Sequence, residues 1–422
     1  MPRSRTSSSG SGPRRGRPGP QRTGTRRGRP PGGPTAAPRP TRTPLVTRQP
    51  QPPVASFAAA GLPPKLVTAL SRKGIDVPFP VQAATLPDAL AGADVLGRAS
   101  TGSGKTLGFG LPTLARLAGG SRTRRRPRAL VMLPTRELAR QVADTLEPLA
   151  HVLGLRIGCV YGGAPIGRQM SMLDKGIDLL VATPGRLVDL LERRAVTLDD
   201  VQIVVLDEAD HLCDLGFLPV MRRLLDLVPA GGQRLLFSAT LDGDVDVLVR
   251  RYLAEPVLVD VAPADADAPG RVEYRVLDVA SREQKPGVVA QLARQVDRTL
   301  IFVRTKHGAD RLAKQLDRIG TAARALHGGM AQPARTRSLA AFADGSVPVL
   351  VATDVAARGI HVDDLALVIH LDPPAEAKTF AHRSGRTGRA GASGSVVSLV
   401  CPDERRLVAR LHADAGVTVE GS

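Results

Sequence analysis

Three acidic side chains follow directly on an apolar run in the segment VVLDEADHL, residues 204–212. They are Asp207, Glu208 and Asp210, and two interpretations compete for them. One is a solvated acidic turn, the usual place for charged side chains. The other is a catalytic group in which carboxylates hold a metal ion and orient or deprotonate a water molecule. The choice depends on what else the chain contains.

A second segment, ASTGSGKT at residues 99–106, has the composition of a phosphate-binding loop. It follows a short apolar run and precedes a helix-like stretch, so its N–H groups would converge on phosphate oxygens at the positive end of a helix. Lys105 would reach the β- and γ-phosphates, and the Thr106 hydroxyl would bind magnesium. Ala99 stands where the general pattern has its first glycine. We expect nucleotide contacts from Ser100, Thr101, Gly102, Ser103, Gly104, Lys105 and Thr106.

Together the two segments favour the catalytic interpretation of the acids. In a phosphate-loop sheet, a neighbouring strand ends in an aspartate that holds magnesium, and an adjacent acid can activate the attacking water. We therefore assign Asp207 to the metal, together with Thr106, and Glu208 to the water. The expected cofactors are ATP and Mg²⁺. A buried strand before Asp207 would place the acids at the carboxyl edge of the sheet, where open α/β sheets bind ligands.

The elements that must position these residues are short aliphatic runs alternating with amphipathic helical stretches. Continuous apolar runs suit strands that are buried on both faces of a parallel sheet. The pattern predicts two doubly wound α/β domains, at residues 55–261 and 271–415, joined by a linker at 262–270. Strands are expected at 129–134, 155–163, 177–184, 201–207 and 234–240, and then at 272–279, 299–305, 348–354, 365–372 and 395–400.

The first 54 residues differ in composition from the rest and are expected to form a disordered basic arm. Residues 1–50 hold twelve arginines and no acid, within a chain of net charge +18, and they are rich in Pro, Gly and Ser. So few large apolar side chains cannot offset the entropy of ordering. Such an arm would bind polyanions in a salt-sensitive way, and a solubilising tail without a partner is the alternative.

The cysteines and the hydropathy pattern exclude several classes of protein. Cys159, Cys213 and Cys401 lie far apart and share no metal-ligand spacing, so neither a zinc site nor a disulfide framework is expected. No signal-peptide apolar region and no membrane-spanning stretch is found in the sequence. We expect a soluble, cytoplasmic protein without a membrane partner.

The segments LDEAD and ASTGSGKT resemble the motifs of DEAD-box RNA helicases, and further motifs extend the resemblance over residues 57–400. The resemblance implies two RecA-like domains that bind ATP and RNA across the cleft between them. It also implies ATP-dependent, local separation of short RNA duplexes and remodelling of RNA–protein complexes. RNA would be held through its backbone, largely independently of sequence.

The resemblance assigns nucleotide roles to residues outside the loop. The stretch GIDVPFPVQ (74–82) resembles the adenine-reading Q motif, in which Gln82 would bond the adenine edge and Phe57 would stack on the base; Phe79 replaces its usual Thr. Arg386 and Arg389 would act as arginine fingers on the transferring phosphoryl group. His361 stands where the family commonly has Asp, so ribose contact there would depend on a neutral imidazole. Residues implied to couple phosphate state to domain movement are Asp210, Ser238, Thr240 and His382.

Short motifs at the predicted strand ends resemble the RNA-binding motifs of the family. The residues concerned are Arg136, Gly162, Gly163, Thr183 and Arg186 in the first domain, and Thr305, Arg335 and Thr353 in the second. Aromatic residues make up only 3% of the chain and Trp is missing, which favours contact with the backbone over base stacking.

Two other functions remain open at this point. The arm contains RRGRP twice, at residues 14–18 and 26–30, which resembles the minor-groove core of the AT-hook and would suit a DNA helicase or translocase. Alternatively, the arm itself would act as an RNA annealer or scaffold. We expect RNA as the main partner, in ribosomal or RNA-decay assemblies, with DNA the weaker candidate.

Overall fold

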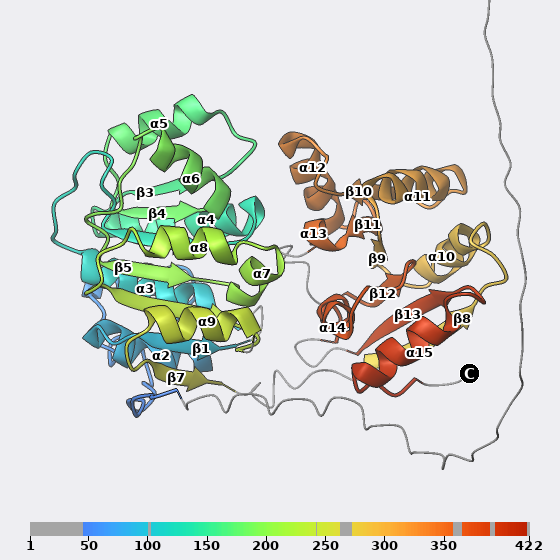
Figure 1. Ribbon diagram of the computed structural model, residues 1–422, viewed down its shortest axis with the longest axis horizontal. Coiled ribbons are helices and arrows are strands. Elements are labelled where there is room, and N and C mark those ends of the chain that lie inside the picture. The colour runs from blue at the N-terminus through green and yellow to red at the C-terminus, as the bar shows by residue number, and fades with distance from the viewer. Residues whose placement is uncertain are drawn as a thin grey trace, which may run out of the picture. The chain divides into compact units, whose positions relative to one another are not determined.

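The computed structural model describes residues 45–99, 103–241, 243–261, 272–357, 365–388 and 393–419. These residues form two parallel β-sheets, each with helices on both faces (Figure 1). The prediction of two doubly wound α/β domains is thereby confirmed. The linker predicted at 262–270 and the arm before residue 45 lie outside the described residues.

The first sheet has seven parallel strands in the order β3-β4-β2-β5-β6-β1-β7. They are β1 (Val95–Arg98), β2 (Ala129–Met132), β3 (Ile157–Val160), β4 (Leu179–Ala182), β5 (Ile203–Leu206), β6 (Gln233–Ser238) and β7 (Val257–Asp260). The aliphatic strands β2, β4 and β5 are buried throughout, as strands covered on both faces must be. Because the strands run the same way, the loops after β5, β6 and β1 meet at one edge of the sheet.

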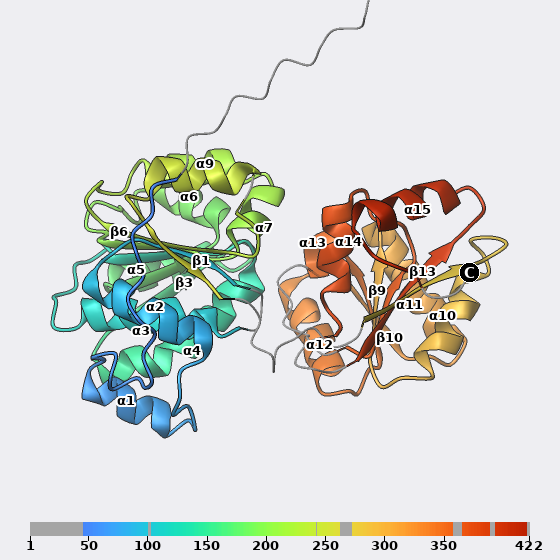
Figure 2. The ribbon, with the colours of Figure 1, turned by 90° about the horizontal axis from the view of Figure 1, so that it is seen from below.

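The helices of the first domain divide between the two faces of this sheet (Figure 2). One face carries α1 (Pro64–Ser71), α2 (Pro80–Ala91), α3 (Lys105–Leu117) and α4 (Arg136–Val152). The other carries α5 (Ile166–Asp174), α6 (Pro184–Glu192), α7 (Ala209–Asp214), α8 (Leu218–Leu225) and α9 (Gly243–Tyr252). Each set buries its apolar side chains in a separate core cluster against the sheet. The outer strand β3 is contacted by α4, one of the helices on the first face, and by α5, one of the helices on the second.

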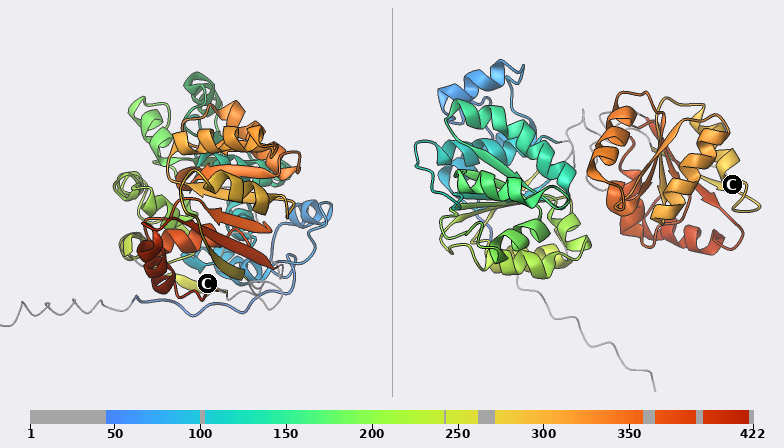
Figure 3. Two further views of the ribbon diagram at one scale, coloured as in Figure 1. Left: turned by 90° about the vertical axis from the view of Figure 1, so that its right-hand side faces the viewer. Right: turned by 90° about the horizontal axis from the view of Figure 1, so that it is seen from above.

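The second sheet has six parallel strands in the order β10-β11-β9-β12-β13-β8. They are β8 (Val272–Asp278), β9 (Thr299–Val303), β10 (Ala323–Leu326), β11 (Val349–Thr353), β12 (Leu367–His370) and β13 (Gly394–Val400). Its helices also cover both faces (Figure 3). They are α10 (Lys285–Ala293) and α11 (Lys306–Arg318) on one side, and α12 (Gln332–Ala343), α13 (Asp354–Ala357), α14 (Ala377–Ser384) and α15 (Arg405–Asp414) on the other. No described helix is long and apolar enough to cross a membrane.

Threonine caps start one helix in each domain. The Thr135 side-chain oxygen accepts from the Leu138 N–H at 3.3 Å, and α4 begins at the next residue. In the second domain, Thr305 Oγ1 accepts from the Gly308 N–H at 3.0 Å, and α11 begins at the next residue. Each cap satisfies an N–H group that has no partner within its helix. The segments PTREL (residues 134–138) and FVRT (residues 302–305) therefore set where these helices begin.

The boundary predicted for the basic arm is wrong for residues 45–54. Arg48 forms a parallel bridge with Val257, and its N–H donates to the Pro256 carbonyl at 3.2 Å. Gln51 donates to both carboxylate oxygens of Asp88, at 3.0 and 3.1 Å. This stretch is poor in apolar residues, so composition assigned it to the arm, but backbone and amide hydrogen bonds attach it to the first domain.

Each arginine of a run at residues 122–128 is paired with an aspartate of the first domain. The pairs are Arg122 and Arg128 with Asp178, Arg124 and Arg125 with Asp174, and Arg126 with Asp200. The exposed pairs among them contribute little to stability. Their effect here is on charge, because the aspartates offset part of the positive charge of the run.

The Asp178 carboxylate is the buried member of this network and the one whose loss should destabilise the fold. Its side chain is 1% exposed and accepts from Arg128 Nη2 at 2.6 Å and from the Arg156 N–H at 2.8 Å. We expect Asp178→Ala to lower the free energy of unfolding by about 3–5 kcal/mol, because it leaves the buried Arg128 guanidinium without its counter-charge. Urea denaturation measures the change. Asp200→Ala, at a side chain 36% exposed, is the control and should cost less than about 1 kcal/mol. Equal losses in the two variants would contradict this prediction.

Candidate functional site

The ends of three neighbouring strands bring together segments that are far apart in the chain. In the order β5-β6-β1, these strands lead into the LDEAD segment, the SAT segment (Ser238–Thr240) and the GSGKT loop, respectively. The loop ends where α3 begins, at Lys105, and the acids lie where α7 begins. Lys105 and the acids therefore meet at the carboxyl edge of the first sheet.

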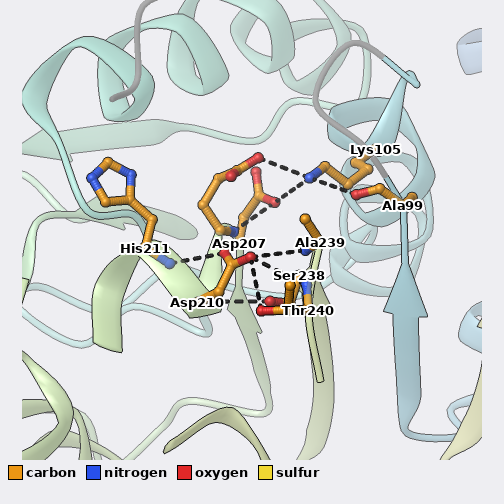
Figure 4. Close-up of polar contacts among 9 residues, drawn as sticks. Ala99, Lys105, Asp207, Asp210, His211, Ser238, Ala239 and Thr240 are labelled. Atoms are coloured by element: carbon orange, nitrogen blue, oxygen red, sulfur yellow. Dashed lines mark hydrogen bonds and ion pairs between the residues drawn. The ribbon is translucent and has the colours of Figure 1, made fainter. Parts of the chain in front are cut away.

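Lys105 lies between the acids and Ala99 (Figure 4). Its side chain is 6% exposed, and Nζ donates to Glu208 Oε1 at 2.8 Å and to the Ala99 carbonyl at 3.2 Å. Asp207 Oδ1 is 3.9 Å from the same nitrogen. The ammonium group thus lies among three oxygens in a site largely closed to water, where charges interact strongly.

Burial and charge act in opposite directions on these pKa values. Burial raises the pKa of Asp207 to about 7, although the Lys105 charge opposes it. Burial would raise the pKa of Glu208 too, but the Lys105 ammonium outweighs it and lowers that pKa to about 2. Burial would lower the pKa of Lys105, and the charges of Glu208 and Asp207 outweigh this and raise it. Lys105 and Glu208 consequently form an ionised pair.

Glu208 occupies a backbone conformation that is rare for its residue type. Its φ is 53° and its ψ is 50°, in the left-handed region, at the cap of α7. Such a conformation costs about 1–3 kcal/mol in a residue other than glycine and is concentrated at functional sites. The turn lets the Glu208 N–H donate to Asp207 Oδ1 at 3.0 Å while the side chain reaches Lys105. The strain is thus tied to the placement of the carboxylate.

Asp210 joins the LDEAD and SAT segments (Figure 4). Its side chain is buried, and Oδ2 accepts from the N–H groups of Ala239 and Thr240, both at 3.2 Å, and from Thr240 Oγ1 at 3.4 Å. The Asp210 N–H in turn donates to Ser238 Oγ at 3.1 Å. A shift of either segment therefore moves the other.

Gln82 attaches the predicted adenine-reading motif to the phosphate loop. Its Oε1 accepts from the Phe79 N–H and its Nε2 donates to the Gly104 carbonyl, both at 3.0 Å. The side chain is 2% exposed in this structure, and its amide has one further N–H and one further lone pair with which it would bond the edge of a purine. Gly104 has a φ of 87°, and a Cβ there would lie 2.5 Å from Gln82 Nε2, so this position requires glycine.

The two phenylalanines of this motif differ in exposure. Phe57 is 2% exposed and belongs to the core cluster that also contains Leu66 and Leu70, so its ring offers no free face in this structure. Base stacking by Phe57 stays a prediction. Phe79 is 56% exposed, and its ring lies against Gly104. Phe79 is therefore an exposed aromatic ring beside the phosphate loop, and the sequence analysis had noted it only as a replacement of the usual Thr.

The oxygen donors beside the loop suit a magnesium ion that is shared with phosphates. Among the described residues, no group of three or more His, Cys, Asp or Glu could hold a metal ion by itself. Thr106 and Asp207 offer a hydroxyl and a carboxylate, the hard ligands that Mg²⁺ prefers, and Mg²⁺ commonly completes its octahedron with phosphate oxygens and water. The donor set fits an ion that arrives with the nucleotide.

The RNA-binding candidates of the first domain gather around the turn between β3 and α5. Arg186 Nη1 donates to the Ala164 carbonyl at 3.1 Å and to Gln169 Oε1 at 2.8 Å. The Arg136 guanidinium packs against Gly163. Gly162 lies in the same turn, and the Thr183 N–H donates to the Val160 carbonyl at 3.0 Å. The structure thus brings all five candidates to one corner of the domain.

In the second domain, Thr305 and Thr353 lie at the ends of β9 and β11, and Arg335 lies on α12. Thr305 caps α11 through its oxygen, which leaves its hydroxyl hydrogen available to a phosphate. Thr353 is the last residue of β11. Arg335 is 7% exposed, and its Nη2 donates to the Ala356 carbonyl at 3.0 Å. Arg335 therefore bonds to α13, the helix that directly follows Thr353.

Arg383 is a residue that the sequence reasoning did not single out. It is 2% exposed, and its Nε and Nη2 donate to the two carboxylate oxygens of Asp354 at 2.6 and 2.8 Å. It joins α14, which carries His382 and leads to Arg386, to the ATD segment at the end of β11. In the sequence, Asp354 and Arg383 belong to two separate motifs, and nothing in their spacing indicates that they form a pair.

Several predicted site residues cannot be located. Ser100, Thr101, Gly102, His361 and Arg389 lie outside the described residues.

Comparison with known proteins identifies the family. The DEAD/DEAH box helicase model matches residues 79–248, and the helicase conserved C-terminal domain model matches residues 284–391. The ATP-dependent RNA helicase RhlB of Pectobacterium atrosepticum is 41% identical over 355 residues, which cover 82% of each chain. The mitochondrial DEAD-box ATP-dependent RNA helicase 9 of Arabidopsis thaliana is also 41% identical, over 86% of this chain. This chain spans only 60% of the length of that plant relative.

A solved structure gives the same result for the fold. Dbp5 of S. cerevisiae bound to RNA and ADP BeF3 aligns with a TM-score of 0.73 and 26% identity, covering 87% of this chain and 95% of that one. Sequence and fold agree with the motif geometry at the first sheet, and this chain belongs to the DEAD-box helicase family.

Proposed function

We propose that this protein is an ATP-dependent RNA helicase that separates short RNA duplexes locally. The observation that carries the proposal is the buried Lys105–Glu208 pair beside Asp207, at the edge where open α/β sheets bind nucleotides. RhlB is named an ATP-dependent RNA helicase, and the Dbp5 structure contains RNA and a nucleotide analogue. Those relatives support RNA as the substrate here.

Binding of ATP exchanges the partners of Lys105. In the nucleotide-free site, its ammonium bonds to Glu208. The β- and γ-phosphates carry more negative charge than one carboxylate and draw the ammonium toward them. The exchange releases the Glu208 carboxylate, which then orients the attacking water and accepts its proton.

Thr106 and Asp207 would hold magnesium, which supplies charge neutralisation at the phosphoryl group when it is bound. The second domain supplies Arg386 and Arg389, whose guanidinium groups balance the charge that develops in the transition state. Hydrolysis in this scheme needs both domains and is completed when ATP and RNA draw them together.

The hydrogen bonds of Asp210 offer a route from the nucleotide to RNA movement. Asp210 is two residues after Glu208 and is bonded to the backbone of Ala239 and Thr240. A change at the γ-phosphate that moves the LDEAD segment therefore also moves the SAT segment. This coupling links phosphate release to the reopening of the domains.

RNA stimulation of ATP hydrolysis tests the proposed function. We expect single-stranded RNA to raise the turnover of ATP by at least about tenfold, the effect of 1.4 kcal/mol of added transition-state stabilisation. DNA of the same sequence should give no such rise, since contacts to 2′-hydroxyl groups separate RNA from DNA. A coupled phosphate-release assay measures both rates.

The same assay distinguishes the alternatives. Equal stimulation by DNA would make the protein a DNA-directed motor and overturn the proposal. Deletion of residues 1–44, which leaves the attached stretch 45–54 in place, tests the arm. If that deletion abolished strand separation while Lys105→Ala spared it, annealing by the arm would be the function.

A further inference from the structure

A groove of about 660 Å³ runs along the free edge of the first sheet, at β3. The C-terminal part of α4 forms one wall and α5 forms the other. Its lining includes the aliphatic side chains Ile157 and Ile177 and four basic side chains, His151, Arg156, Arg168 and Lys175. Glu147 is the one acid among the described residues that line it.

Three of the basic side chains that line this groove have no ion-pair partner in the part of the chain that the structure describes. Arg156, Arg168 and Lys175 are exposed, and no ion pair or side-chain hydrogen bond joins them to another described residue. The neighbouring arginine run at 122–128 behaves in the opposite way, since each of its arginines is paired with an aspartate. Each of those five arginines therefore has an acidic partner, whereas the three cations that line the groove have none.

The first turn of α5 connects the groove to the turn at which the RNA-binding candidates of the first domain gather. Arg136, Gly163 and Arg186 lie around the turn that leads into α5. α5 begins at Ile166, and Gly167 and Arg168 in its first turn already line the groove. A strand of nucleic acid held at that turn would meet Arg168 next, and then Arg156 and Lys175.

We propose that single-stranded RNA flanking the central site continues along this groove, with its phosphates on Arg156, Arg168 and Lys175. The proposal rests on the proposed function and extends the RNA path beyond the family motifs. Guanidinium and ammonium groups bind phosphate whatever the base sequence. The aliphatic floor lacks the aromatic platforms on which bases stack, so the contact is to the sugar-phosphate backbone. An extended acidic peptide is the competing occupant.

RNA length provides the test. The shortest oligouridylate that saturates ATPase stimulation is compared with the same RNA extended by a single-stranded tract at the 5′ or the 3′ end. We expect the triple variant Arg156→Ala, Arg168→Ala, Lys175→Ala to bind one of the extended RNAs about tenfold more weakly and to bind the short RNA with unchanged affinity. The slope of log K against log salt for the extended RNA should become shallower by about 2, because each phosphate that the variant no longer neutralises accounts for about 0.7.

A matched variant controls for the loss of three charges. Lys65→Ala, Arg72→Ala, Lys73→Ala removes three exposed cations of the same domain that do not line the groove, and it should leave the extended RNA bound as before. Equal weakening of the short and extended RNAs, or no weakening of either extended RNA, would overturn the proposal. Loss of polyglutamate binding with extended RNA still bound would also overturn it, in favour of a peptide site. Failure of any RNA to stimulate the unaltered protein would instead count against the proposed function. The short RNA is then chosen as the shortest oligouridylate that binds the unaltered protein, and the binding comparison still decides the groove.

Discussion

Replacing Lys105 by alanine lowers the rate of ATP hydrolysis by at least about 100-fold, the loss seen when one preorganised transition-state donor is removed. The ammonium group is buried between Glu208 and the Ala99 carbonyl, at the end of β1, where it is already close to the position of the phosphates. Water admitted into the vacated space is a poor substitute, because it must reorganise as charge develops. Steady-state phosphate release with saturating RNA measures the change.

Lys105→Ala also leaves two buried carboxylates without their cation, so loss of folding has to be separated from loss of catalysis. Lys105→Arg is the matched variant: it keeps a positive charge beside Glu208 and Asp207, and should unfold at the same urea concentration as the unaltered protein. Its planar guanidinium cannot take the place of a compact ammonium on the phosphates, so its hydrolysis should still fall by about tenfold or more. Normal hydrolysis in Lys105→Ala would remove this residue from the mechanism.

Glu208→Gln should reduce kcat for ATP by about 100- to 10,000-fold, the contribution of a positioned general base. The amide has nearly the same shape as the carboxylate but cannot accept the proton of the attacking water. ATP should bind more tightly to this variant, because a neutral amide no longer competes with the phosphates for the Lys105 ammonium. Single-turnover hydrolysis and titration with a fluorescent ATP analogue measure the two effects.

Glu192→Gln is the control for Glu208→Gln. That side chain is 57% exposed on α6 and pairs only with the exposed Arg223 among the described residues, so hydrolysis and ATP affinity should not change. Two results would contradict the assignment of Glu208 as the base. One is a kcat within about threefold of the unaltered protein, a difference of less than 1 kcal/mol. The other is weaker ATP binding, which would mean that Glu208 supports the nucleotide rather than competing with it.

Strands buried on both faces were the clearest parts of the fold in the sequence, and the longer apolar runs of the edge strands β3 and β8 were also predicted. Strands such as β2 and β5 contain only aliphatic residues or Met and are fully buried, so their runs stand out. The outer strands β7 and β10 were not predicted. β7 alternates buried and exposed residues over only four positions, and β10 contains the exposed Arg324, so each pattern is too short to distinguish from a loop. An edge strand pairs with a neighbour on one side only, so fewer of its side chains have to be apolar.

The site was predictable in its composition and less so in its contacts. The loop motif and the acids each indicate phosphate chemistry, and the parallel strands bring both to the carboxyl edge of the first sheet. The direct bond between Lys105 and Glu208 could not be foreseen, because it depends on the left-handed conformation of Glu208. The pairing of Arg383 with Asp354 depends on how α14 lies against the end of β11, which is set by tertiary packing. The burial of Phe57 has the same origin.

The strand orders of the two sheets carry a consequence for the ancestry of the chain. Six strands of the first sheet have the order β3-β4-β2-β5-β6-β1, and the strands of the second have the order β10-β11-β9-β12-β13-β8. Each strand of the second sheet thus has the same position as the strand of the first sheet whose number is lower by seven. Thr305 then corresponds to Thr135 and Gly328–Gly329 to Gly162–Gly163, and Asp372 follows β12 as Asp207 follows β5. Such agreement indicates an internal duplication. The segment that follows β8 contains no counterpart of the GSGKT loop. Of the two copies, only the first therefore retains a loop that can bind a triphosphate.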